Sequence, residues 1–89
     1  YLSAEERRIA TQLNLIMRAS AGAARSGAAI PSVEAEAKAK LQAAGFSSVD
    51  YIAIRDAETL APIGDLSAPA RILAAAWLNK TRLSDNMAV

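Results

Sequence analysis

The sequence contains no cysteine and no histidine among its 89 residues. Without cysteine there is no disulfide and no thiolate nucleophile, and without either residue the usual zinc ligands are missing. The absence of histidine also removes the side chain that normally titrates near neutral pH, and with it most catalytic triads and acid/base pairs. We therefore predict no catalytic residue, no cofactor-binding residue and no metal ligand in this chain.

Long apolar runs are also absent. The longest spans residues 72–78, far short of the roughly 20 residues that cross a bilayer, and no signal-peptide pattern opens the chain. We expect a cytoplasmic protein with no membrane partner, and the lack of cysteine fits that reducing compartment. The net charge of +1, from ten basic and nine acidic residues, is too balanced to predict capture of nucleic acid.

Apolar residues nevertheless make up 53% of the chain, enough for a folded core, although many of them are alanine. A chain of this length forms one domain, and we expect that domain to span residues 1–89. The sequence begins at Tyr1, without methionine and just before a predicted helix start. We interpret this as a domain boundary that follows another domain.

A first helix is predicted to start at Ala4. Ser3 and Glu6 have the spacing of a capping box, in which each side chain binds the other's backbone amide. Ser26 and Gly27 are expected to end this helix. Its apolar stripe has helical spacing and comprises Ile9, Leu13, Ile16, Met17, Ser20 and Ala24.

A second helix is predicted from residue 31 or 32 to residue 44. Pro31 fits the first helical position, whereas Ser32 could itself be the N-cap. Gly45 suits a left-handed C-cap, after which Phe46 can pack back on Leu41. Two pairs of opposite charge in the favourable i,i+4 order are expected on the exposed side: Glu34–Lys38 and Glu36–Lys40.

Three strands are predicted to follow. Residues 49–55 alternate in strand fashion, and the carboxylate of Asp56 is expected to cap a turn after them. Residues 71–78 suit a buried strand with Trp77 as its main core residue. Asn79 and Lys80 suit a two-residue hairpin turn before a strand that starts at Thr81. The predicted fold class is α+β, with two N-terminal helices packed on a small three-stranded antiparallel sheet.

Four segments carry a family likeness. They are YLSAEER at the start, DYIAIRD at residues 50–56, AETL directly after it, and the hairpin of residues 70–86, which ends in TRLSDN. In this order they resemble the C-terminal domain of the pantothenate synthetase (pantoate–beta-alanine ligase) family. The resemblance covers essentially the whole chain and is weakest between residues 20 and 44.

The resemblance implies a two-domain ligase. Such an enzyme condenses pantoate with beta-alanine, using ATP and Mg²⁺ through a pantoyl adenylate, and releases pantothenate, AMP and pyrophosphate. In that family the nucleotide and pantoate sites lie mainly in a larger N-terminal Rossmann-like domain. That catalytic domain would be the partner of this chain, which would be inactive alone, and the full-length enzyme would be a homodimer. We expect this domain to act as a lid, rotating about residues 1–3.

Three arginines are the candidate site residues. Arginine can meet a carboxylate or a phosphate through its planar fork, so contacts with the N-terminal domain or with ATP phosphates are one interpretation of these residues. Ordinary pairing on the sheet surface is the other. The candidates are Arg55, Arg71 and Arg82, and the carboxylates that could pair with them on the sheet surface are those of Asp56, Asp85 or Asp50.

A different class of function stays open at this stage. The first helix carries four arginines opposed by only two glutamates, and a stand-alone interaction module could use this basic helix to bind an acidic partner or nucleic acid. The arginines are Arg7, Arg8, Arg18 and Arg25, and the glutamates are Glu5 and Glu6.

Overall fold

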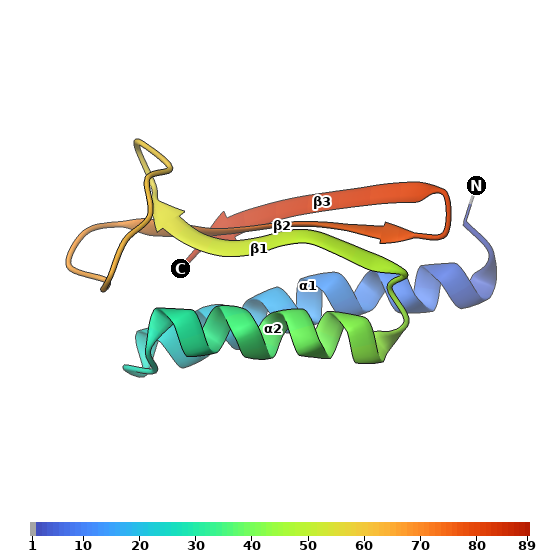
Figure 1. Cartoon of the computed structure of the whole chain (residues 1–89), viewed down its shortest axis with the longest axis horizontal. Coiled ribbons are helices and arrows are strands. Elements are labelled where there is room, and N and C mark those ends of the chain that lie inside the picture. Colours follow the sequence, from blue (N-terminus) through green and yellow to red (C-terminus); the bar gives the residue numbers. More distant parts are fainter. Residues whose placement is uncertain (1) are drawn as a thin grey trace.

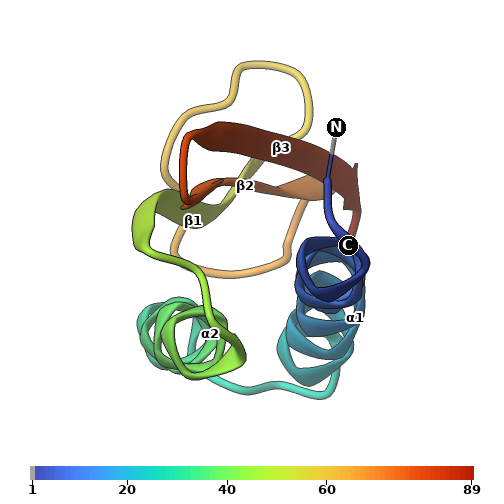
Figure 2. The ribbon, with the colours of Figure 1, turned by 90° about the vertical axis from the view of Figure 1, so that its right-hand side faces the viewer.

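The computed structural model describes residues 2–89 and shows a two-layer α+β architecture. Its elements are α1 (Ala4–Arg25), α2 (Ile30–Ala44), β1 (Ser48–Asp56), β2 (Ala70–Leu78) and β3 (Thr81–Ala88). The strands form one antiparallel sheet in the order β1-β2-β3. Both helices lie side by side on the same face of this sheet (Figures 1 and 2). The predicted fold class is confirmed.

Helix α1 begins where the capping box places it. The Ser3 hydroxyl accepts from the Glu6 amide at 3.0 Å, and the Glu6 carboxylate accepts from the Ser3 amide at 2.9 Å. Ser26 is the C-cap, as expected. The buried face follows the predicted stripe except that Ile9 is half-buried; it comprises Leu13, Ile16, Met17, Ser20, Ala21 and Ala24.

Helix α2 starts at Ile30, slightly before either predicted position. Ala29 is the N-cap and makes no side-chain hydrogen bond, so the interpretation of Ser32 as the cap is wrong. At the other end Gly45 adopts the expected left-handed conformation, with φ 117°. The amide of Phe46 donates to the Leu41 carbonyl at 3.3 Å, and both side chains are buried in the same core.

The expected charge pairs on α2 do not form. Among residues 2–89 the ion pairs are Arg8–Glu5 and Arg82–Asp50. The Glu34 carboxylate instead accepts a hydrogen bond from the Ile54 amide, at 2.9 Å. Since β1 is an edge strand, this amide has no partner strand on that side. A carboxylate that binds such an amide stabilises the fold by more than an exposed i,i+4 pair does.

The core lies between the helices and the inner face of the sheet. Ala74 and Ala76 of β2 are fully buried there, and their small side chains let the helices approach closely. The prediction of Trp77 as the main core residue is wrong. Alternation along β2 directs Ala76 and Leu78 toward the helices and therefore Trp77 away from them, where it is half-buried. The largest fully buried side chains are Met17, Leu41, Ile54 and Ile72.

The turn between β2 and β3 is tied to the start of α1. Asn79 has φ 57°, which confirms the predicted hairpin. Its side-chain amide donates to the Glu6 carboxylate at 2.9 Å, and its backbone amide donates to the Ser47 hydroxyl at 3.1 Å. One end of the molecule is thus held by hydrogen bonds between distant parts of the chain (Figure 1). No helix within residues 2–89 has the length and apolar character needed to cross a membrane.

Replacement of Gly45 by alanine tests the C-cap. A Cβ at this position would strain the positive φ and lie 3.1 Å from Ile9 Cδ1, so we expect a loss of about 1–3 kcal/mol of unfolding free energy. Gly64→Ala is the matched control, because a Cβ there meets nothing within 4 Å. Urea denaturation of both variants measures the difference, and equal stability would contradict this account of the helix end.

Candidate functional site

The three candidate arginines share one face of the sheet. Side chains alternate along each strand, so the residues directly before and after the buried Ile54 and Ile72 in the sequence point away from the helices. Arg55 on β1 is the direct cross-strand partner of Arg71 on β2, and Arg82 on β3 is the partner of Trp77. We call the face opposite the helices the outer face. Arginines from all three strands lie on this face, but only Arg55 and Arg71 are neighbours, because Arg82 lies opposite Trp77 toward the other end of β2.

Arg82 is neutralised within the sheet. Its Nε donates to Asp50 Oδ2 at 2.9 Å, and the Trp77 indole donates to the same oxygen at 3.2 Å. Asp50 lies at a β-bulge between Val49 and Tyr51. The Arg82 guanidinium, aided by Trp77, holds the pKa of Asp50 below its ordinary value, and Asp50 in turn raises the pKa of Arg82. The expected pairing of Arg82 with Asp50 is therefore present.

Arg55 and Arg71 have no such carboxylate. Among the described residues, Arg71 donates from Nε and Nη2 to Asn86 Oδ1, at 3.0 and 2.8 Å. Arg55 donates from Nη1 to the Leu60 carbonyl at 3.3 Å. Both acceptors are neutral, and neither arginine forms an ion pair with a carboxylate of residues 2–89.

The carboxylates expected to pair with these arginines bind backbone amides instead. Asp56 Oδ1 accepts from the amides of Glu58 and Thr59, at 2.8 and 3.0 Å. These hydrogen bonds, chiefly the one from Thr59, hold the pKa of Asp56 below its ordinary value. Asp85 Oδ1 likewise accepts from the Asn86 amide at 2.8 Å. Of the three expected carboxylates, Asp56 and Asp85 therefore form no ion pair with an arginine among residues 2–89.

A shallow hollow lies on the outer face beside Arg55. The loop that follows β1 rises over this side of the sheet, away from the helices (Figure 2). The hollow has a volume of about 250 Å³ and is lined by Tyr51, Ala53, Arg55, Leu60 and Leu73. Tyr51 is 45% exposed and Leu60 is 47% exposed. Apolar side chains thus meet one unbalanced guanidinium in a space open to solvent.

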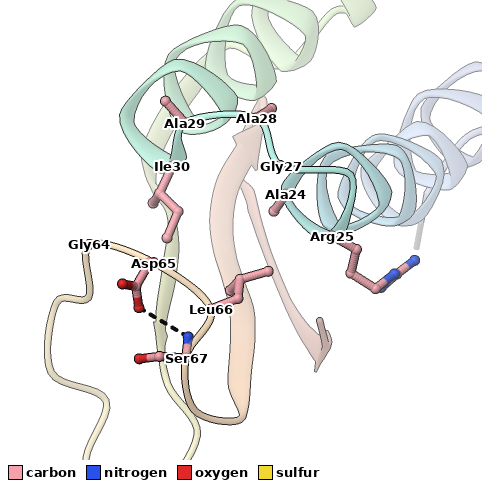
Figure 3. Close-up of a pocket in the computed structure, with 10 residues that line it drawn as sticks. All are labelled: Ala24, Arg25, Gly27, Ala28, Ala29, Ile30, Gly64, Asp65, Leu66 and Ser67. Atoms are coloured by element: carbon pink, nitrogen blue, oxygen red, sulfur yellow. Dashed lines mark hydrogen bonds between the residues drawn. The ribbon is translucent and has the colours of Figure 1, made fainter.

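A second hollow lies at the far end of the helices, between the α1–α2 turn and residues 64–67 (Figure 3). Asp65 accepts a hydrogen bond from the Ser67 amide at 3.0 Å, so its carboxylate is engaged within the loop. The Arg25 side chain points away from the other lining residues (Figure 3). Polar groups do not converge on this space, and it lacks the character of a binding site.

The outer face offers groups suited to binding. Within residues 2–89 there is no group of three or more acidic, histidine or cysteine side chains that could hold a metal ion. The outer face offers guanidinium groups for a carboxylate or phosphate and apolar surface beside them. Sequence reasoning found Arg55 and Arg71 but missed Leu60, whose positive φ of 60° no pattern in the sequence indicates.

The basic helix forms a sparse surface. Arg7, Arg18 and Arg25 are exposed on one side of α1, and Arg8 is paired with Glu5 at 2.7 Å. At a rise of about 1.5 Å per residue, the three free arginines are spread over roughly 27 Å. This density of charge is low compared with the one phosphate per roughly 1.7 Å of duplex DNA. The structure therefore offers little support for the nucleic-acid alternative.

Comparison with known proteins identifies the family. The family model described as pantoate-beta-alanine ligase matches residues 1–88. A pantothenate synthetase from Caulobacter vibrioides is 54% identical over 94 residues, which cover 100% of this chain and 32% of the relative. That from Sphingopyxis alaskensis is 43% identical over 89 residues, with the same two coverages. The crystal structure of pantothenate synthetase from Thermus thermophilus matches with a TM-score of 0.85 at 34% identity, over 98% of this chain and 32% of that one.

These matches show a domain shared by a family of ligases. The chain belongs to the pantoate-beta-alanine ligase family, as its resemblance to that family predicted. It spans about a third of the length of the curated relatives that it matches, since 32% of each of these relatives is covered.

Carboxylates with lowered pKa values, among them Glu6, Asp50 and Asp56, predict how stability depends on pH. Hydrogen bonds from the Ser3 amide and then from Asn79 hold the pKa of Glu6 below its ordinary value of 4.5. A depressed pKa stabilises the fold above the unfolded value, and this contribution is lost as pH falls through the folded value. Stability should therefore decline as pH drops below about 4.5, and further below the ordinary aspartate value of 3.8 because of Asp50 and Asp56.

Urea midpoints between pH 6 and pH 2.5, roughly the range that brackets these carboxyl groups, measure this decline. Glu6→Gln should flatten the upper part of the curve, because the amide does not titrate. The exposed Glu36 of α2 provides the control variant Glu36→Gln. A wild-type midpoint that does not change on acidification would contradict the assignment.

Proposed function

We propose that this chain is the C-terminal domain of a two-domain pantothenate synthetase. The observation that carries the proposal is the family match over residues 1–88, together with coverage of only 32% of the relatives' length. The complete enzyme would join pantoate to beta-alanine with ATP, through a pantoyl adenylate, and release AMP and pyrophosphate. An N-terminal Rossmann-like domain would hold these substrates and form the contacts of a homodimer in the cytoplasm.

The acidic residues that the structure describes bear on how the work is divided between the two domains. The described residues provide no carboxylate cluster for Mg²⁺, which prefers oxygen ligands. The residues therefore do not fit this ion, and we assign its site to the rest of the longer protein. ATP would likewise bind mainly there. The contribution of the present domain would be geometric, through its rigid sheet and the arginines on the outer face.

A lid function accounts for a domain of this kind. An acyl adenylate is readily hydrolysed, so a domain that closes over the site protects the intermediate and strengthens charge interactions within it. Arg55, Arg71 and Arg82 are the candidate contacts with the N-terminal domain or with ATP phosphates on closure. Ser3 is fixed to α1 by the capping box, so we place the rotation at or before this residue. Tyr1, part of the expected hinge, lies outside the described residues.

Activity of the longer protein tests the proposal. A protein of full family length that contains this chain should form pantothenate only when ATP, pantoate and beta-alanine are all present. The 89-residue chain should form none under the same conditions, because it lacks the substrate sites. Coupled detection of AMP release measures both. Robust ligation by the short chain, or none by a folded protein of full length, would overturn the assignment.

Closure can be measured separately from turnover. We expect the angle between the domains of the longer protein to decrease when nucleotide binds, since a lid has to open for substrates and close for chemistry. Small-angle scattering, or the distance between fluorophores on the exposed Lys38 and on the N-terminal domain, reports this change. A distance that is the same with and without ATP would contradict the lid function, but it would not affect the family assignment.

A further inference from the structure

We propose that the hollow on the outer face, together with Arg55 and Arg71, docks a segment of the longer protein's N-terminal domain. The segment presents a carboxylate beside an apolar side chain. This inference rests on the proposed function, which supplies the partner domain, and deepens it by assigning the contact to two of the three candidate arginines. Arg82 is left out because Asp50 already neutralises it.

The charge of the segment follows from the arginine pair. Arg55 and Arg71 are direct partners across neighbouring antiparallel strands, and like charges in this arrangement destabilise a sheet. The acceptors recorded for them are the neutral Leu60 carbonyl and the neutral Asn86 side chain. Since arginine remains charged at every physiological pH, a carboxylate brought to this site would offset part of this positive charge. The pair is unfavourable in this chain alone and favourable against an acidic partner.

The apolar component follows from Leu60. A bulky residue with positive φ is a conformational outlier, and Leu60 adopts φ 60° while its side chain remains 47% exposed. Neither backbone preference nor burial within the described residues explains a leucine here. Strain of this kind suggests a role in contact with another molecule. Leu60 lines the hollow together with Tyr51 and Leu73, so an incoming apolar side chain would meet all three.

The size of the hollow favours a protein segment over the nucleotide. Its volume of about 250 Å³ lies below the roughly 300–1,000 Å³ of small-molecule sites. It suits one or two side chains of a partner. The relatives are about three times as long as this chain, since it covers 32% of them, so a partner surface in the same polypeptide is available. Exposed apolar surface rimmed by charge is typical of such contacts.

Side-chain footprinting with hydroxyl radicals tests whether the hollow is covered. Tyr51 and Leu60 should label several-fold more slowly in the full-length protein with ATP bound than in the 89-residue chain. Leu15 on α1, which is 50% exposed, is the matched reference and should label equally in both. Equal labelling of Tyr51 and Leu60 in the two proteins would overturn the proposal. This readout does not require ligase activity, so a failure of the proposed function is recognised independently.

Variants of the full-length protein identify the chemistry of the partner. Arg55→Glu and Arg71→Glu should each restore the labelling of Tyr51 toward that of the short chain, whereas Arg18→Glu, an exposed arginine on α1, should not. If the two reversals raise the KM for ATP but leave Tyr51 protected, the arginines contact phosphate and the docking proposal fails. Protection that appears in the short chain with rising concentration would indicate a second copy and would also overturn it.

Leu60→Asn should stabilise the short chain but weaken the docking in the full-length protein. Asparagine tolerates positive φ better than leucine does, so the variant should raise the urea midpoint of the 89-residue chain. In the full-length protein the same variant should increase the labelling of Tyr51 several-fold, because the apolar contact is lost. Leu15→Asn should change the labelling of Tyr51 in neither protein. A Leu60→Asn protein that keeps Tyr51 fully protected would contradict the role of Leu60.

Discussion

The structure depends on the alternation of side chains along the central strand β2. On the inner face this strand presents Ile72, Ala74, Ala76 and Leu78, all of them buried. The two alanines are small enough to let both helices pack closely on the sheet, and a larger residue at either position would separate the layers. The same alternation necessarily turns Arg71, Leu73 and Trp77 outward. One strand therefore determines both where the core lies and what the outer face can bind.

Local patterns predicted most of the fold because each depends on contacts close in sequence. The capping box at Ser3 and Glu6, the glycine C-cap at Gly45 and the turn at Asn79 all involve neighbouring residues, and all three are confirmed. One error arose where distant segments compete for the same group. Glu34 was expected to pair along its helix, but folding brings it to the unpaired Ile54 amide of the edge strand. No pattern within α2 contains that information.

The candidate site was predictable only in part, for the same reason. Arginine chemistry and strand position singled out Arg55, Arg71 and Arg82, but their balance of charge depends on where nearby carboxylates point. Asp50 at the bulge reaches Arg82, whereas the other expected partners turn to backbone amides. Short aspartate side chains readily bind nearby amides in this way. The distinction between one neutralised arginine and two unbalanced ones therefore needed the three-dimensional structure.

The features that lower stability in this chain are not scattered. One end of the molecule is well connected, since Glu6, Ser47 and Asn79 join α1 to the hairpin by hydrogen bonds. The unfavourable features lie instead on the outer face: two like charges on neighbouring strands, and a leucine that is both strained and exposed. Natural sequences tolerate local conflict mainly where it serves function. The proposed docking accounts for their concentration on one face, because a single partner surface that binds there would relieve these conflicts together.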